Sequence, residues 1–307
     1  MSQISLQADE TYMDERLDKF LSAMLPDQSR SYLQKIIKDG NVLVNGEPKK
    51  SSYRLEDGDE VTADLPELKS PDIEPENIPL DILYEDDSIL MVNKPKGMVV
   101  HPSAGHYSGT LVNAIMYHCK DSLSGINGQI RPGIVHRIDM DTTGSLIVCK
   151  NDESHVNIAE QIKEHTVNRI YVGIVCGNVT EDEGTIEGAI GRHPVDRKKM
   201  AVKEKNGKPA ITHYKVLERF GNYTYMQFQL ETGRTHQIRV HMASIGHPLL
   251  GDTLYSSGRS PFKHLQGQTL HAKTIGFVHP KSGEYMEFSA PLPEYFDNLL
   301  KLLKSRS

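Results

Sequence analysis

Residues 131–148 read RPGIVHRIDMDTTGSLIV, and they place polar side chains directly before a short apolar run. The polar side chains are His136, Arg137, Asp139 and Asp141. The apolar run at 145–148 has the composition of a buried strand, and Gly133 and Gly144 bound the loop before it. Because binding and catalytic groups are commonly carried by loops at the ends of buried strands, the stretch predicts a functional site.

Two other interpretations fit the residue types of this loop. His136, Asp139 and Asp141 are metal-ligating types, but no HExxH motif or cysteine pair accompanies them, and Arg137 would repel a cation. The other alternative is a turn held by hydrogen bonds from aspartate side chains to the backbone. Spacing alone favours this turn over a site.

The segments around the loop predict an α+β domain. Apolar runs at 89–92 and 145–148 suit buried strands, while YTYMQFQL at 223–230 alternates with a period of two. Three apolar stripes predict helices: Leu111, Ala114 and Ile115 after Thr110; Val156, Ala159 and Ile162; and Phe296, Leu299, Leu300 and Leu303. Strands outnumber helices without a regular alternation, which favours a mixed, largely antiparallel β-sheet flanked by helices and loops.

The stretch LETGRTHQIRVHMASIGHPLLGD, residues 230–252, predicts a helix with polar groups at its beginning. Its apolar stripe is Ile238, His241, Met242 and Ile245. Thr235 is expected to cap the helix and Gly246 to end it. Arg234 would then lie at a helix N-terminus, a position suited to binding a phosphate, while His236 and Arg239 would share an adjacent face.

The first seventy residues predict a separate unit of two helices and a small sheet. The helical stripes are Leu17, Phe20, Leu21 and Met24, then Leu33, Ile36 and Ile37. Ser29 is expected to cap the second helix and Gly40 to stop it. Val42 and Val44 lead into a hairpin turn at 45–46, and Asp57-Gly58 marks another turn. The proline-rich, acidic segment 66–79 predicts an extended linker.

The composition is that of an ordinary globular protein. The length of 307 residues leaves room for one large and one small domain. No stretch approaches the roughly 18 apolar residues of a membrane span, and the N-terminus lacks a secretory pattern, so a cytoplasmic location is expected. Cys119, Cys149 and Cys176 are odd in number and far apart, which argues against a disulfide framework or a cysteine-based zinc site and favours buried thiols.

The net charge of −6 would argue against a nucleic-acid partner, but the charge is unevenly distributed. Residues 29–54 hold six basic and two acidic side chains, and residues 192–208 hold seven basic and two acidic ones. Either segment alone is compatible with a solvated face. Taken together with the four motifs below, the two segments favour contact with RNA.

Four motifs resemble the pseudouridine synthases that act on large-subunit ribosomal RNA. HRIDMDTTG at 136–144 resembles the family motif HRLDxxTSG, with conservative departures at Ile138 and Thr143. The first family motif resembles residues 93–102, NKPKGMVVHP, and the strand that carries the active-site tyrosine resembles residues 168–175, NRIYVGIV. The fourth motif resembles residues 230–252, and all four follow one another in the order expected for the family. The resemblance covers residues 81–293 and implies a pseudouridine synthase fold.

Residue by residue, the resemblance implies specific roles in the site. The catalytic aspartate corresponds to Asp139, the tyrosine to Tyr171, and the arginine that pairs with the aspartate to Arg239. The family usually has lysine two residues before the tyrosine, whereas this chain has Arg169. RNA contacts would fall to Arg137, which displaces the base, and to Arg234 and His236.

The N-terminal segment resembles the small α/β RNA-binding domain named after ribosomal protein S4, through ERLDKFL, SRSYLQKIIKDGNVLVNG and LEDGDEV. In that family the helices present basic side chains to phosphates, which points to Arg30, Lys35 and Lys38. The alternative is a small domain that only packs on its neighbour. We therefore expect an S4-like domain at 13–65, a linker at 66–79 and a catalytic domain at 80–305.

The resemblance implies an isomerase that converts uridine to pseudouridine in RNA, without a cofactor or metal and as a monomer. Arg239 would keep Asp139 ionised and aimed, whether the carboxylate attacks the base, attacks the sugar or removes a proton. The target nucleotide must leave its stack, which costs least in loops of a stem-loop. Large-subunit ribosomal RNA is the expected target, with transfer RNA as the alternative.

Two rival functions remain open at this stage. One is a non-catalytic RNA-binding assembly factor on a scaffold descended from an enzyme. The other is a metal-dependent hydrolase built on histidines, which include His101, His106, His136, His236 and His241. Most histidines in a protein of this kind are surface or core residues with ordinary hydrogen bonds.

Overall fold

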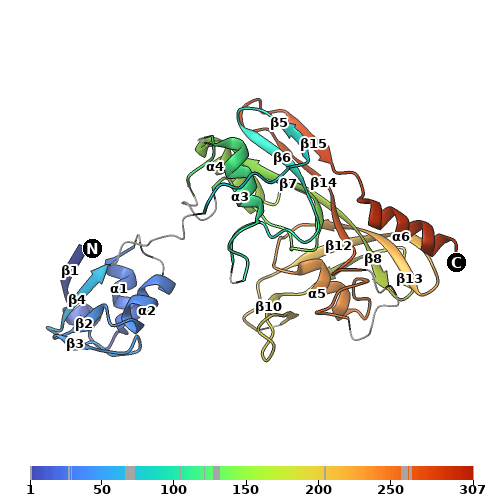
Figure 1. Ribbon diagram of the computed structural model, residues 1–307. Helices are drawn as coiled ribbons and strands as arrows, with labels where there is room; N and C mark the ends of the chain where they lie inside the picture. The colour runs from blue at the N-terminus through green and yellow to red at the C-terminus, as the bar shows by residue number, and fades with distance from the viewer. Residues whose placement is uncertain are drawn as a thin grey trace. The chain divides into compact units, whose positions relative to one another are not determined.

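The computed structural model describes residues 2–26, 28, 30–65, 73–103, 105–120, 122–126, 132–203, 205–256, 262 and 265–306. The chain forms two compact units, Met1–Lys69 and Ser70–Ser307 (Figure 1). The predicted cap Ser29 and residues 66–72 of the predicted linker lie outside the described residues. Within the described ranges, no helix has the length and apolar character needed to cross a membrane.

The first unit contains the two predicted helices packed on a small antiparallel sheet of order β1-β4-β2-β3. Its strands are β1 (Ser2–Gln7), β2 (Val42–Val44), β3 (Glu47–Pro48) and β4 (Glu60–Leu65), and its helices are η1 (Glu10–Tyr12), α1 (Leu17–Met24) and α2 (Arg30–Lys38). Asn45 and Gly46 both have positive φ, at 51° and 77°, as the predicted hairpin turn requires. Strand β1 was not predicted, because its pairing with β4 is formed across more than fifty residues of chain.

The helical stripes of this unit are buried as expected, except at one position. Leu17, Phe20 and Leu21 are fully buried, whereas Met24 in the last turn of α1 is 39% exposed. Leu33, Ile36 and Ile37 of α2 are buried in the same core. The opposite face of α2 exposes Lys35 and Lys38.

The second unit is built on a nine-stranded sheet of order β5-β6-β7-β14-β8-β13-β12-β9, with β15 paired to β14. Its strands are β5 (Ile82–Glu85), β6 (Ile89–Lys94), β7 (Thr143–Cys149), β8 (Asn168–Cys176), β9 (Glu183–Glu187), β12 (Ile211–Arg219), β13 (Tyr223–Leu230), β14 (Leu270–Val278) and β15 (Tyr285–Ser289). A separate hairpin joins β10 (Ile190–Arg192) and β11 (Met200–Val202). Among the pairs in this described sheet only β7–β14 is parallel, so the predicted mixed, largely antiparallel α+β fold is confirmed.

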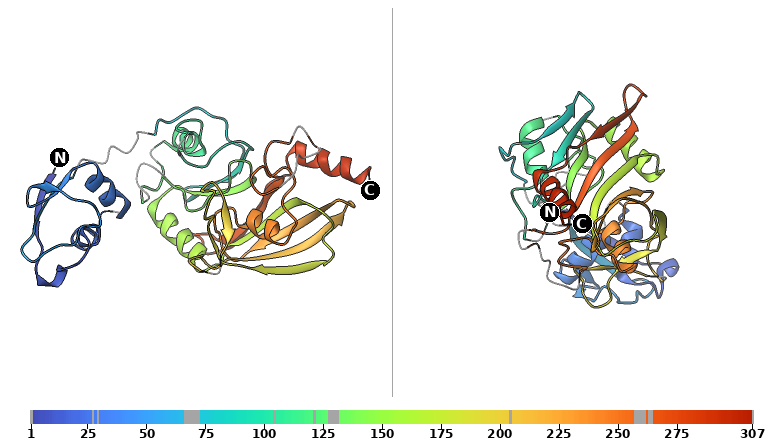
Figure 2. Two further views of the ribbon diagram at one scale, coloured as in Figure 1. Left: turned by 90° about the horizontal axis from the view of Figure 1, so that it is seen from below. Right: turned by 90° about the vertical axis from the view of Figure 1, so that its right-hand side faces the viewer.

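Both faces of the central strands are covered by helices. The helices of this unit are α3 (Leu111–Cys119), α4 (Asp152–Lys163), α5 (Gln237–Ser244) and α6 (Glu294–Lys304). One core layer joins α3 and α5 to the sheet, while α4 and α6 pack in two separate clusters with the alternate residues of the same strands. α3 and α4 lie beside β6 and β7, and α6 lies beside β8 and β13 (Figure 1, Figure 2).

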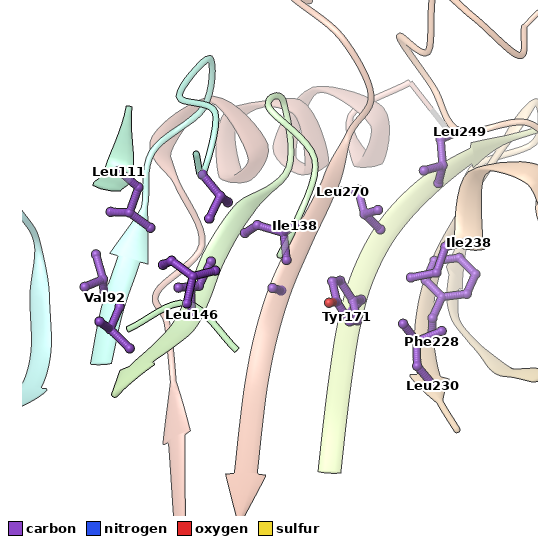
Figure 3. Packing of buried hydrophobic residues seen from close by; sticks show 14 of the residues in the cluster. Val92, Leu111, Ile138, Leu146, Tyr171, Phe228, Leu230, Ile238, Leu249 and Leu270 are labelled. Carbon is purple, nitrogen blue, oxygen red and sulfur yellow. The ribbon is translucent and has the colours of Figure 1, made fainter. Parts of the chain in front are cut away.

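Tyr171 of β8 belongs to the core layer that holds α3 and α5. Figure 3 shows its ring in the middle of this layer, with Ile138 toward β7 and with Phe228 and Ile238 toward β13. Ile138 is the residue directly before Asp139, so the loop of the predicted site is anchored in the same core.

One predicted stripe was wrong in part. Val156 of α4 is 61% exposed, and the buried residues of this helix are Ser154, His155 and Ile158. Residues two apart lie about 200° apart around a helix, so Val156 and Ile158 cannot both face the sheet. The three predicted thiols are free; Cys119 and Cys149 are buried, and Cys176 is partly exposed.

Candidate active site

Asp139 lies in the loop that precedes β7, and the side chain of a buried lysine holds this loop in place. Lys94, at the end of β6, is fully buried. Its ammonium group donates to the carbonyl oxygens of Pro95 at 2.7 Å, Met98 at 2.8 Å and Met140 at 2.9 Å. The lysine therefore ties the loop after β6 to the turn that carries Asp139.

Gly144 at the end of the same motif also has a structural role. Its φ is +110°, and a Cβ at this position would run into the carbonyl group of Ala272 on β14. The close approach allows the parallel pairing of β7 with β14. Glycine is therefore required where the motif HRIDMDTTG ends.

Arg239 of α5 holds Asp139 from the other side of the pocket, although the two residues are 100 positions apart in the sequence. Its Nη1 donates to Asp139 Oδ2 at 2.9 Å. Its Nε and Nη2 donate to the two carboxylate oxygens of Asp252 at 2.7 and 3.0 Å. Asp252 is fully buried, so one guanidinium joins two carboxylates.

The electrostatics of this triad favour the charged arginine. Burial alone would lower the pKa of Arg239, but its hydrogen bonds to Asp252 and the charges of Asp139 and Asp252 raise the pKa above its usual value. The guanidinium also lies over the ring of Tyr255, 5.1 Å from the centroid. Arg239 is therefore a permanent cation beside Asp139.

Two polar side chains of α5 fix the helix against β12. Gln237 donates to the carbonyl of Ile211 at 2.9 Å and to Thr212 Oγ1 at 3.0 Å, and it accepts the Arg234 N–H at 2.9 Å. His241 contacts Thr212 Oγ1 at 2.9 Å and donates from Nε2 to the carbonyl of Gly188 at 3.0 Å. These contacts set the position from which Arg239 reaches Asp139.

The start of α5 differs from the prediction. Thr235 does not cap the helix; the cap position is occupied by His236, in a left-handed conformation with φ +56° and without a capping hydrogen bond from its side chain. Ile245, predicted in the apolar stripe, is 41% exposed. The Gln237 side chain accepts the Arg234 N–H and donates to β12, and these contacts, which the local sequence does not show, set the turn before α5.

The predicted site residues of the second unit line one pocket of about 490 Å³. They are Arg137, Asp139, Tyr171, Arg234, His236 and Arg239. The pocket is also lined by Lys163, His165 and Arg169, so its wall is strongly cationic around a single carboxylate. Such a wall suits an anionic ligand.

Tyr171 and Arg169 form the floor on β8. Tyr171 is 9% exposed; burial raises the pKa of its phenol, the Arg169 charge opposes that shift, and Asp139 adds to it. The phenol is therefore protonated at neutral pH. Arg169 donates from Nη2 to the Glu231 carbonyl at 3.0 Å, and its Nε has no hydrogen-bond partner among the described residues.

The other candidates occupy different places. Arg137 is exposed, with Nη1 3.5 Å from His101 Nε2. His136 lines the pocket, but its Nε2 accepts the Ile147 N–H at 3.0 Å. Within the described parts of the chain, no three His, Cys, Asp or Glu side chains are grouped so as to hold a metal ion. Lys35 and Lys38 lie in the first unit, and the side chain of Arg30 lies outside the described residues.

Sequence reasoning missed Lys94, Asp252, Tyr255 and the positioning role of Gln237. Asp252 and Gln237 stand inside the motif-rich stretch 230–252, so their polarity within an apolar surrounding was a usable signal. Lys94 and Tyr255 contact groups from distant segments that only the fold brings together.

The second unit therefore combines a carboxylate, a paired arginine and a tyrosine in one cationic pocket, and the first unit exposes lysines, an arrangement typical of an enzyme that acts on an anionic substrate. The profile of the RNA pseudouridylate synthase family matches residues 88–244, and the profile of the S4 domain matches residues 15–61. The chain belongs to the RNA pseudouridylate synthase family, whose members are isomerases, and it is an RNA-binding protein.

Relatives extend the likeness over nearly the whole chain. The uncharacterized RNA pseudouridine synthase YlyB of Bacillus subtilis is 51% identical over 99% of this chain and 99% of its own length. A ribosomal large subunit pseudouridine synthase D of Zymomonas mobilis is 44% identical over 94% of this chain and 93% of its own. The solved structure of human RNA pseudouridylate synthase domain containing 1 covers 75% of this chain and 96% of its own, with a TM-score of 0.57 and 25% identity.

Proposed function

We propose that the protein isomerises uridine to pseudouridine in large-subunit ribosomal RNA, with Asp139 as the essential carboxylate. The observation that carries the proposal is the 2.9 Å hydrogen bond from Arg239 to Asp139 inside a cationic pocket. Relatives that share 42–45% identity are named ribosomal large subunit pseudouridine synthase D, which supports the choice of RNA.

The reaction breaks the bond from C1′ to N1 of uracil and forms one from C1′ to C5. The C5 proton is lost and N1 gains a proton, so no atom is added and no redox partner is consumed. Asp139 would act on the base, the sugar or a sugar proton, oriented by its hydrogen bond from Arg239. Tyr171 would support the uracil face and help to move the C5 proton through its phenol.

RNA contacts would come from both units. Arg137 is exposed at the mouth of the pocket, where its guanidinium plane can stack on the bases next to the extruded nucleotide. Arg234 and His236 would contact the nucleotide at the pocket wall, and the basic segment 192–208 would bind phosphates of the stem-loop. Arg30, Lys35 and Lys38 would bind phosphates from an S4-like domain at 13–65.

The remaining parts of the proposal concern organisation and setting. A linker at 66–79 would join the S4-like domain to a catalytic domain at 80–305. A ribosomal RNA substrate places the enzyme in the cytoplasm, and we propose that it acts as a monomer. Transfer RNA is the alternative substrate, and an RNA-binding assembly factor is the alternative without catalysis.

The test is to incubate purified protein with total RNA from cells that lack it, and to map new pseudouridines. We expect modification in large-subunit ribosomal RNA with the wild type and none with Asp139→Asn. Asp141→Asn is the matched control, because Asp141 belongs to the same loop but does not line the pocket. Modification confined to transfer RNA would overturn the substrate, and an active Asp139→Asn variant would overturn the role of Asp139.

A further inference from the structure

Tyr255 connects three parts of the site through one hydroxyl group. It accepts the backbone N–H of Met200, at the start of β11, at 2.8 Å. The same oxygen lies 2.8 Å from Nδ1 of His236. The Nε2 atom of His236 lies 3.9 Å from Asp139 Oδ1, the carboxylate oxygen that Arg239 does not hold.

The directions of these hydrogen bonds can be deduced from the partners. A backbone N–H can only donate, so the Tyr255 oxygen accepts from Met200 and its own proton remains available. A neutral imidazole carries one proton, and a carboxylate favours an N–H on the nitrogen that faces it. The Tyr255 proton finds an acceptor, and Asp139 faces an N–H, when Tyr255 donates to Nδ1 and His236 carries its proton on Nε2.

His236 is held neutral by its surroundings. Burial lowers the pKa of His236, the Asp139 and Asp252 charges oppose this, and Arg239 and Arg137 add to it. A neutral ring beside the Arg239 cation avoids placing two positive charges next to each other.

We propose that Tyr255 fixes His236 as the Nε2–H tautomer, and that His236 is a positioning residue that holds Asp139 Oδ1 when the pocket is filled. This rests on the proposed function of Asp139. Nε2 and Oδ1 are 3.9 Å apart, and catalytic contacts of this kind commonly shorten when a substrate binds. Asp139 then has a donor for each oxygen, Arg239 for Oδ2 and His236 for Oδ1.

The tautomer can be tested without any activity measurement. In ¹⁵N-labelled protein, the His236 signals, assigned by their absence in His236→Gln, should show a protonated Nε2 and an unprotonated Nδ1. Tyr255→Phe keeps the ring under Arg239 but removes the hydroxyl, and it should give a mixture of tautomers. A wild-type His236 protonated on Nδ1 would overturn the proposal, even for an active enzyme.

Two substitutions of His236 separate the tautomers by activity. The glutamine amide nitrogen can take the place of Nε2, whereas the asparagine amide nitrogen takes the place of Nδ1. We expect His236→Gln to retain most of the kcat and His236→Asn to lose roughly 10- to 100-fold, the value of a hydrogen bond to a charged group. Asparagine tolerates the left-handed backbone at this position better than glutamine. Backbone strain therefore cannot explain a lower kcat for His236→Asn than for His236→Gln.

Tyr255→Phe should lower kcat about tenfold with little change in RNA affinity. Tyr84→Phe is the matched control, because it also removes a donated hydrogen bond, to Asp86 at 2.9 Å, on a strand that does not line the pocket. Equal activity of the Asn and Gln variants, or a Tyr255→Phe variant that resembles the control, would overturn the positioning role. Absence of pseudouridine formation by the wild type would instead contradict the proposed function.

Discussion

Replacing Asp252 by asparagine is expected to destabilise the second unit far more than the same change at Asp139, although Asp139 is the residue required for activity. Asp252 is fully buried and accepts two hydrogen bonds from Arg239. It also accepts the N–H groups of Leu254 at 2.9 Å and Tyr255 at 3.1 Å. The side chain of Asp139 is 19% exposed and accepts one hydrogen bond from the same arginine.

The magnitudes follow from what each change leaves behind. Removing one partner of a buried ion pair costs about 3–5 kcal/mol, and asparagine retains one acceptor oxygen, so we expect about 3 kcal/mol for Asp252→Asn. Asp139→Asn leaves Arg239 neutralised by Asp252, and we expect about 1 kcal/mol or less. For a unit of this size, the first change lowers Tm by roughly 6–12 °C and the second by less than about 4 °C.

Calorimetry on the full chain measures these shifts, and pseudouridine formation at a temperature where both variants are folded measures activity. The two assays should rank the variants in opposite ways. Asp139→Asn should have the higher Tm and no activity, and Asp252→Asn should have the lower Tm and part of the wild-type activity. Equal destabilisation by the two changes would refute the reasoning, because Asp252 would then not be the main counter-ion of Arg239.

Two further predictions concern pH and RNA affinity. Burial lowers the pKa of His271 to about 4 from its ordinary 6.5, so the unfolded chain binds a proton that the folded chain does not. The neutral His271 therefore contributes its full share to the free energy of unfolding above about pH 6.5, and this contribution falls as the pH drops toward about 4. Urea titrations at pH 7 and pH 5 should show that the free energy of unfolding decreases less for His271→Gln than for the wild type. Changing Lys35 and Lys38 together to alanine should weaken RNA binding and reduce the slope of log K against log salt by roughly 1–2, with kcat at saturating RNA unchanged. An unchanged salt slope would contradict phosphate contacts by α2.

Elements with local, periodic signals were predictable from sequence. The alternation of YTYMQFQL appears in β13 as buried residues alternating with more exposed ones from Tyr223 to Leu230. The cap at Thr110 was also predictable, because Asn113 lies three residues later and the two residues form a capping box. In both cases the deciding interactions lie within one element.

Features that depend on distant partners were not predictable in this way. Thr235 has the residue type of a cap, but the contacts of Gln237 with β12 decide the geometry of this turn. Lys94 reads as a surface lysine by type, yet the carbonyl groups that bury it come partly from Met140, 46 residues later. The pairing of Asp139 with Arg239 was expected only from the resemblance, since no local pattern links residues 100 apart.

The shared arginine bears on why Asp139 can react. If Arg239 bound Asp139 alone and bidentately, both carboxylate oxygens would be occupied by strong donors and the pair would be a neutral, inert ion pair. Asp252 instead accepts two of the three hydrogen bonds that this guanidinium donates to the two carboxylates, which leaves Asp139 with one and gives the triad a formal net charge of −1. Arg239 thus orients Asp139 through Oδ2, while Oδ1 faces Nε2 of His236 at 3.9 Å. An Asp252→Glu variant that shifted this guanidinium toward Asp139 should therefore lower kcat while leaving RNA binding intact, and unchanged kcat would show that the division of the hydrogen bonds does not matter.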